Sequence, residues 1–324
     1  MKKTIYSILG AAMLLMLASC GTEVEPARTP VASIDINKTT LVINESMEIH
    51  FTGVADQVVI FTGDEGRKYQ DYGKGEIKAN TGVVVNKGFF TYSYAVPGVF
   101  HVVVVASTYD TYSGNGLKQA KYEFDVTVDD DINTIDKIFF QSQAHNVFYA
   151  NAVNDKDWVF CIPTCEVYNN KDVKTNISRR SLSFEIASDS AKVYIDGEVY
   201  ASRNTYNLDQ NHDLKVVSYK GSTREYKLWK LRYPEFTTIA VGEAEGTLKR
   251  DAFNQDLLTY TFTGVSGKDG LVETHEDGVE FLVNGKAPTS DVDYSDPDNV
   301  YTLVRTDKEN TAVKAVTRVK FVFN

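Results

Sequence analysis

An acidic segment near the C-terminal end of the sequence carries the densest set of side chains that could bind a metal ion. Its oxygen-bearing side chains stand at alternate or adjacent positions, at Asp291, Asp293, Ser295 and Asp296. Ca²⁺ takes oxygen ligands, so this pattern could hold it. The segment departs from a helix–loop–helix calcium loop, because Asp296 and Thr302 replace the glycine and the glutamate of its sixth and twelfth positions. We therefore favour an ordinary solvated loop, with a calcium site as the alternative.

Two cysteines stand close together in the middle of the chain, at Cys161 and Cys165. A fully extended chain would place them about 13 Å apart, beyond the reach of a disulfide, whereas a turn at Pro163 could bring them together. We expect two separate half-buried thiols, and a loop disulfide is the alternative because exported proteins permit one. A zinc site is disfavoured, since no second pair of Cys or His residues stands at ligand spacing.

Four tyrosines lie in two polar loops and are the candidate ligand-binding residues. They are Tyr69, Tyr72, Tyr109 and Tyr112. An exposed aromatic ring can stack on the face of a sugar as it does on a base. Packing of the same rings at the end of their own domain is the alternative, and the sequence leaves both open.

The sequence contains no pattern typical of a catalytic site. The nucleophile-elbow, zinc-protease, phosphate-loop and dinucleotide patterns are absent, and the five histidines are scattered without paired spacing. We therefore predict that the protein is not an enzyme. The formal net charge of −10 also argues against nucleic acid as a partner.

The N-terminal residues have the pattern of a secretory signal. Two lysines at positions 2 and 3 precede a short apolar run at residues 5–17, and two small residues then precede Cys20. The apolar run is too short to span a bilayer, so residues 1–19 are predicted to be a signal peptide. Its removal would change the net charge from −10 to about −12.

The tetrapeptide Leu-Ala-Ser-Cys at residues 17–20 resembles a bacterial lipobox. The resemblance implies cleavage before Cys20 and acylation of this residue, and each buried CH₂ of the acyl chains contributes about 0.8 kcal/mol to membrane binding. Residues 20–30 contain two prolines and no apolar periodicity, so we expect a tether between the lipidated cysteine and the first domain.

The remaining chain is predicted to be all-β. The 19 tyrosines and 17 phenylalanines far outnumber the 2 tryptophans, and proline is sparse. Short strand-like segments recur at regular intervals, as in sandwich domains. We expect three consecutive immunoglobulin-like β-sandwiches, at residues 31–131, 134–233 and 235–324. The third repeats the second: residues 193–197 match residues 281–285 at an offset of 88 (285 minus 197), which continues over the following loop.

The first domain also resembles a known family. The segment Phe-Thr-Gly-Asp-Glu-Gly at residues 61–66, Tyr-Ser-Tyr at 92–94 and Pro-Gly-Val-Phe-His-Val at 97–102 resemble a polycystic-kidney-disease (PKD) type domain. Such PKD-like modules open many Bacteroidetes lipoproteins, and the closing hairpin of the second domain is similar to their cadherin-like and Ig-like repeats. Glu23 and Glu25 resemble the acidic residues that route such lipoproteins to the outer surface. The resemblance implies a lipid anchor in the outer membrane and exposure at the cell surface.

These observations lead to one main functional hypothesis and one alternative. The main hypothesis is a lipid-anchored, non-catalytic cell-envelope protein that captures a glycan or nutrient, in partnership with an outer-membrane importer. The alternative is a fimbrillin-like or scaffold subunit that assembles with protein partners. The sequence leaves open the ligand, the domain that binds it, the membrane leaflet and the oligomeric state.

Overall fold

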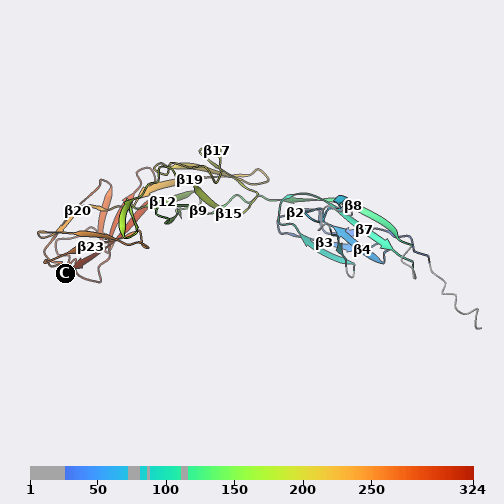
Figure 1. Cartoon of the computed structure of the whole chain (residues 1–324), viewed down its shortest axis with the longest axis horizontal. Coiled ribbons are helices and arrows are strands. Elements are labelled where there is room, and N and C mark those ends of the chain that lie inside the picture. The colour runs from blue at the N-terminus through green and yellow to red at the C-terminus, as the bar shows by residue number, and fades with distance from the viewer. Residues whose placement is uncertain (1–25, 72–80, 86–87, 111–115) are drawn as a thin grey trace, which may run out of the picture. The chain divides into compact units, whose positions relative to one another are not determined.

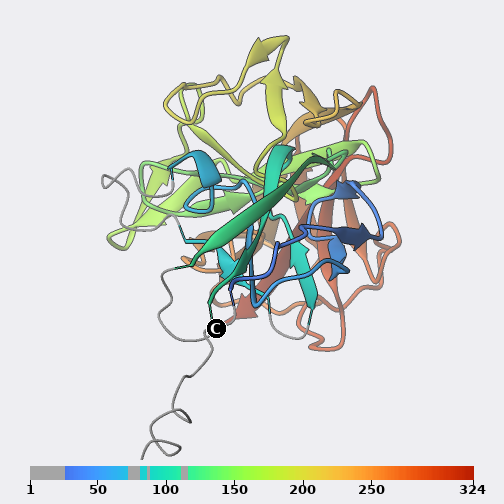
Figure 2. The ribbon, with the colours of Figure 1, turned by 90° about the vertical axis from the view of Figure 1, so that its right-hand side faces the viewer.

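The computed structural model describes residues 26–71, 81–85, 88–110 and 116–324, and the prediction of an all-β fold is confirmed. The described elements are strands, apart from one short 3₁₀ helix, η1 (Tyr69–Asp71) (Figures 1 and 2). None of the described helical residues forms a segment long and apolar enough to cross a membrane. The chain divides into two compact units, residues 1–130 and 131–324. The predicted signal peptide, Cys20, Glu23 and Glu25 lie outside the described residues.

The first unit is a sandwich of a three-stranded and a five-stranded sheet. The first sheet has the order β1 (Ile34–Ile36), β3 (Ser46–Phe51), β6 (Phe89–Ser93). The second has the order β2 (Thr40–Val42), β8 (Lys118–Asp129), β7 (Gly98–Thr108), β4 (Gln57–Phe61), β5 (Val83–Val84). The central strand β7 is apolar on both faces. Val102 and Val104 enter the core between the sheets, and Val103 and Val105 lie in a second cluster on the outer face.

Part of the predicted tether is bound to the first sandwich. Ala27 is buried, and its carbonyl accepts a hydrogen bond from Lys118 Nζ at 2.6 Å. The carbonyl of Arg28 accepts one from Thr108 Oγ1 at 2.7 Å. The expectation of a spacer through residue 30 is therefore corrected for these residues. The sequence could not show this, because a proline-containing segment without periodicity can still have its carbonyls bound by side chains of neighbouring strands.

The second sandwich combines a three-stranded sheet with a six-stranded one. The first has the order β10 (Val147–Tyr149), β9 (Ile135–Gln141), β15 (Leu182–Ile186). The second has the order β11 (Asn151–Ala152), β12 (Asp157–Ile162), β19 (Thr223–Arg232), β18 (His212–Val217), β16 (Lys192–Ile195), β17 (Glu198–Val199). Strands β13 (Cys165–Tyr168) and β14 (Lys171–Lys174) pair only with each other, as a hairpin outside both sheets.

The third sandwich repeats this strand order, except that residues 235–324 form no strand equivalent to β17. Its three-stranded sheet has the order β21 (Ala244–Glu245), β20 (Phe236–Val241), β24 (Leu271–His275). Its five-stranded sheet has the order β22 (Thr247–Arg250), β23 (Leu257–Phe262), β27 (Lys314–Phe323), β26 (Tyr301–Thr306), β25 (Val279–Val283). The pairs β12/β19 and β23/β27 are both parallel. The turns Asp196-Gly197 and Asn284-Gly285 match as well, with both residues of each at positive φ, as a two-residue hairpin turn requires.

The hairpin β13–β14 is the main difference between the two copies. Strands β12 and β23 begin 100 positions apart (257 minus 157), whereas β15 and β24 begin 89 apart (271 minus 182). The second sandwich therefore has an insertion of 11 residues between these strands, where the third has only the loop 263–270. The hairpin is therefore an addition to the shared topology, present in the second sandwich and replaced by a short loop in the third.

The second and third sandwiches share a small buried cluster. Val159, Trp229 and Leu231, on the outer face of the six-stranded sheet, pack against the fully buried Val313 and Ala315. Burial of this apolar surface ties the two sandwiches together, at about 25 cal/mol per Å² removed from water.

Asp157 connects the two sandwiches through hydrogen bonds. Its carboxylate accepts bonds from the Trp229 indole at 2.7 Å, from Asn154 at 2.8 Å and from Asn310 of the third sandwich at 3.3 Å. Partial burial opposes ionisation of Asp157, but these three bonds outweigh it and lower the pKa of the carboxyl group.

We expect the stability contributed by the ionised Asp157 to depend on pH. Because the folded-state pKa is lowered, this contribution is complete above the unfolded-state pKa of about 4 and is lost as the pH falls further. Asp157→Asn should lower the free energy of unfolding by about 1 kcal/mol at pH 7 and should flatten its decline in acid. Urea unfolding between pH 7 and pH 3 checks this. An equally steep acid decline in Asp157→Asn and the wild type would contradict it.

Candidate functional site

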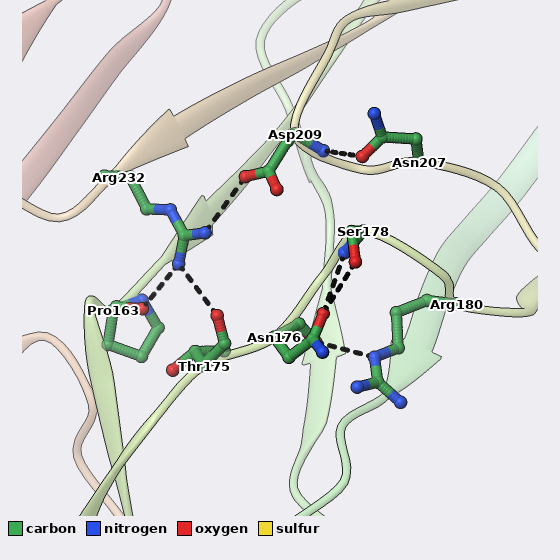
Figure 3. A network of polar contacts seen from close by, with 8 residues as sticks. All are labelled: Pro163, Thr175, Asn176, Ser178, Arg180, Asn207, Asp209 and Arg232. Atoms are coloured by element: carbon green, nitrogen blue, oxygen red, sulfur yellow. Dashed lines mark hydrogen bonds and ion pairs between the residues drawn. The ribbon is translucent and has the colours of Figure 1, made fainter.

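The base of the inserted hairpin β13–β14 holds a network of polar contacts (Figure 3). Arg232, the last residue of β19, donates from Nη1 to the Pro163 carbonyl at 3.0 Å and to the Thr175 carbonyl at 3.5 Å. Pro163 precedes the hairpin and Thr175 follows it, and the Thr175 amide donates to the Thr164 carbonyl at 3.0 Å. One guanidinium thus joins both ends of the hairpin. The planar fork of arginine suits this role, whereas the single ammonium of lysine does not.

Arg232 also binds the loop before β18. Its Nη2 donates to Asp209 Oδ1 at 3.1 Å, and the amide of Asp209 donates to Asn207 Oδ1 at 3.1 Å. The Asp209 carboxylate is therefore held toward the hairpin base, as Figure 3 shows. A paired carboxylate of this kind remains a hydrogen-bond acceptor for a ligand, because each oxygen offers more than one lone pair.

The segment after the hairpin forms the opposite side of the network. Asn176 Oδ1 accepts bonds from the Ser178 amide at 3.1 Å and from the Ser178 hydroxyl at 2.9 Å. Arg180 Nε donates to the Asn176 carbonyl at 2.7 Å (Figure 3). These contacts fix the backbone of an irregular segment, which is needed if such a segment is to position a ligand.

These elements enclose a cleft of about 540 Å³, the hairpin-base cleft. It is lined by Gln143, Lys174, Thr175, Asn176, Ile177, Ser178, Asp209 and Arg232. Seven of these eight side chains are polar, and together they offer amide, hydroxyl, carboxylate and cationic groups. The volume is within the range of small-molecule sites, and this mixture of donors and acceptors matches a ligand rich in hydroxyl groups. The lining contains no histidine or cysteine that could act as a base or nucleophile.

A buried carboxylate anchors the first strand of the hairpin. Glu166 of β13 is only 2% exposed. It accepts bonds from the Ser142 hydroxyl at 2.6 Å and from the Asn146 side-chain amide at 2.8 Å, both in the turn between β9 and β10. Burial of a carboxylate is costly unless it is hydrogen-bonded, so these bonds tie the hairpin to the sandwich. Beside the cleft, the buried Thr175 Oγ1 has no hydrogen-bond partner among the described residues.

Two of the four predicted tyrosines, Tyr69 and Tyr109, lie within the described residues. The ring of Tyr69 packs edge-to-face on Phe61 at 5.2 Å, with Lys121 Nζ 4.1 Å from the ring centroid. Tyr109 is exposed, and its hydroxyl donates to Gln57 Oε1 at 2.9 Å. Tyr72 and Tyr112 lie outside the described residues. The contacts of Tyr69 agree with the alternative of packing within its own domain.

The acidic loop uses its carboxylates to stabilise its own turns. Asp293 Oδ1 accepts bonds from the Ser295 hydroxyl at 2.6 Å and amide at 3.0 Å, and these bonds lower the pKa of the Asp293 carboxyl group. Asp296 Oδ1 accepts a bond from the amide of Asp298, and hydrogen bonding by Thr289 lowers the pKa of Asp291. Among the residues with described positions, no group of three or more His, Cys, Asp or Glu side chains is arranged to hold a metal ion. Calcium binding stays a prediction.

Both cysteines of this region are free thiols, so the alternative of a loop disulfide is corrected. Strand β12 stays extended through Ile162, which directs Cys161 toward the third sandwich, where its Sγ donates to the Lys314 carbonyl at 3.6 Å. Burial raises the pKa of the Cys161 thiol to about 11. Cys165 instead begins β13, opposite Lys174 in the hairpin. The two thiols therefore belong to different neighbourhoods, as the favoured prediction expects.

Sequence reasoning missed the hairpin-base cleft. Its residues come from four separate stretches, represented by Gln143, Thr175, Asp209 and Arg232, and none of them belongs to a recognised motif. One signal was available: the offset between the two repeats changes by 11 positions across the segment that holds the hairpin. An alignment extended upstream of the matching stretch would have located the insertion.

Comparisons with known proteins find structural similarity only. No protein-family model matches the chain, and no curated protein matches it. Among solved structures, it is similar to the fibronectin(III)-like modules of Clostridium thermocellum CbhA, with 10% identity over 62% of this chain and 95% of that chain and a TM-score of 0.21. It is also similar to the C-terminal fragment of intimin in complex with the intimin-binding domain of the translocated intimin receptor (13% identity, 64% and 67% coverage, TM-score 0.23). A third is the 3Ig structure of titin domains (9% identity, 93% and 99% coverage, TM-score 0.21). The strand order of the chain itself establishes tandem Ig-like β-sandwiches.

Proposed function

We propose that this protein is a non-catalytic binding protein of the bacterial cell envelope that captures a hydroxyl-rich ligand, a glycan, in the hairpin-base cleft. The cleft is the observation that carries the proposal. It is concave and is lined almost wholly by polar side chains. Hydrogen bonds from Arg232 hold its walls in place. Such preorganisation reduces the entropy lost when a polar ligand binds.

The proposal keeps the anchor suggested by the lipobox resemblance. Acylation of Cys20 would attach the chain to the outer membrane, and the resemblance to Bacteroidetes lipoproteins supports exposure at the cell surface beside an importer. The tandem sandwiches would then carry the binding cleft as an extracellular module. The binding site moves, relative to the sequence-based hypothesis, from the tyrosines of the first sandwich to the polar cleft of the second.

The test is a screen of the soluble chain, residues 22–324, against a panel of polysaccharides by affinity electrophoresis, with and without calcium. We expect retardation by at least one polysaccharide. The double variant Gln143→Ala with Lys174→Ala should weaken it about thirtyfold, because two hydrogen bonds of about 1 kcal/mol each are lost. Both side chains are exposed, so the variant should fold normally. Lys286→Ala, which removes an exposed lysine of the third sandwich, is the matched control.

The outcomes separate the candidate sites. Retardation that survives the double variant but is lost in Tyr69→Ala with Tyr72→Ala, or in Tyr109→Ala with Tyr112→Ala, would return the site to the first sandwich. Loss of binding when calcium is chelated would favour the acidic loop as the binding site. An absence of retardation by every polymer would contradict glycan capture and favour the alternative, assembly with protein partners.

A further inference from the structure

We infer that the third sandwich holds the β13–β14 hairpin in place through Arg250, and that this contact sets the shape of the hairpin-base cleft in the second sandwich. The binding unit is then the pair of sandwiches rather than the second alone. The inference rests on the proposed function only for the identity of the ligand that the cleft binds. The positioning role itself depends on contacts within residues 131–324.

Arg250 is the last residue of β22 and contacts two other parts of the unit. Its Nη1 donates to Asp172 Oδ2 of β14 at 2.5 Å, and its Nη2 donates to Glu235 Oε2 at 2.5 Å. Glu235 stands between the last strand of the second sandwich and the first strand of the third. One guanidinium therefore connects the inserted hairpin, the linker and the third sandwich.

The environment of Arg250 makes this contact strong. Its side chain is only 12% exposed, and an ion pair screened from water is worth more than one on the surface. Burial opposes the charged form of Arg250, but the Glu235 and Asp172 carboxylates outweigh it and raise the pKa of the guanidinium. Removal of the arginine would leave the Asp172 and Glu235 carboxylates without the counter-charge that they share. Their repulsion would push the hairpin away from the third sandwich.

The hairpin needs such a support because no sheet includes it. Its three polar anchors are Arg232 at its base, the turn that binds Glu166, and Arg250 at Asp172. Asp172 is separated from Lys174 by one residue, and Lys174 and Thr175 both line the cleft. A shift of β14 at Asp172 must therefore move one wall of the cleft. Arg250 does not line the cleft, so it acts as a positioning residue.

The experiment uses the soluble chain with Arg250→Met and two readouts. The first is amide hydrogen exchange without any ligand. We expect the hairpin, residues 165–175, to exchange about tenfold faster, because the free energy of its local opening falls. The paired strands β18 and β19 should keep their protection. The second readout is retardation by the polysaccharide that the wild type retains, which should weaken about three- to tenfold.

Three further variants sharpen the result. Asp172→Asn breaks the same contact from the hairpin side and should reproduce the faster exchange. Arg250→Lys keeps the charge but can reach only one carboxylate well, so it should restore part of the protection. Arg305→Met removes another partly buried arginine of the third sandwich, one paired with Glu276, and should leave the hairpin unchanged.

The two readouts can fail separately. Faster hairpin exchange in Arg250→Met, with no polysaccharide bound even by the wild type, would uphold the positioning role and contradict the proposed function. Unchanged hairpin exchange in both Arg250→Met and Asp172→Asn would overturn the inference. If Arg250→Met lost protection throughout the third sandwich, Asp172→Asn would decide the question alone, since this change lies outside that sandwich.

Discussion

Replacement of Arg232 by methionine is expected to abolish glycan retention and to lower the free energy of unfolding of residues 131–324 by about 2–4 kcal/mol. Methionine preserves much of the apolar stem of arginine but removes the contacts to Pro163, Thr175 and Asp209. Two carbonyls and a carboxylate would lose their common donor. Because the side chain is only 22% exposed, solvent can replace these bonds only in part.

Tryptophan fluorescence during urea unfolding measures this effect directly. Both tryptophans of the chain, Trp158 and Trp229, lie in the second sandwich, so the signal reports on the part that contains the hairpin. The control is Arg318→Met, which removes an arginine that binds Asp256 with two hydrogen bonds on an exposed surface. Exposed pairs contribute about 0–1 kcal/mol, so this variant should unfold almost as the wild type does. Equal stability of Arg232→Met and Arg318→Met would contradict the role assigned to Arg232.

Replacement of Phe160 by alanine should lower the free energy of unfolding of the same unit by about 3–5 kcal/mol, the range for loss of a large aromatic side chain from a core. Phe160 is 1% exposed. It packs edge-to-face on Phe140, with ring centroids 5.0 Å apart, and Phe140 stacks on Phe148. The substitution therefore removes one ring of this buried aromatic cluster. It leaves a cavity that rigid strands can close only partly.

Phe253 offers a matched control for this prediction. It is 94% exposed, so Phe253→Ala removes a ring of the same size without opening a cavity. Its expected effect is within about 0.5 kcal/mol. Urea midpoints followed by tryptophan fluorescence compare the two variants. A loss of similar size in both would mean that Phe160 does not act through core packing.

The fold class of this protein can be predicted from its sequence alone. Alternating strands, sparse proline and the turn pairs at residues 196–197 and 284–285 predict an all-β chain, and the structure confirms it. These signals are local, because strand alternation and turn chemistry depend on neighbouring residues. Two further favoured predictions are also local. The acidic loop is predicted to be an ordinary loop, and its carboxylates cap their own turns. The two cysteines are predicted to be separate, and both are free thiols.

Local signals could not show what the tyrosines contact or where a ligand could bind. Tyr69 lies in a polar stretch of sequence, yet its ring is covered by Phe61 and Lys121, which come from other strands. The segment at residues 26–30 likewise looked like a free tether because its partners, Thr108 and Lys118, are about 80 to 90 positions away.

The candidate site depends on contacts that form only in the tertiary structure. Arg232 meets Pro163 and Thr175 because β19 pairs in parallel with β12, which brings the end of β19 to the point where the hairpin leaves the sandwich. Arg250 meets Asp172 because the third sandwich packs on the second through Val313 and Ala315. Each contact joins residues that are dozens of positions apart, and its geometry depends on register and packing. Periodicity therefore predicted the strands, whereas the cleft between them became visible only when the strands were in place.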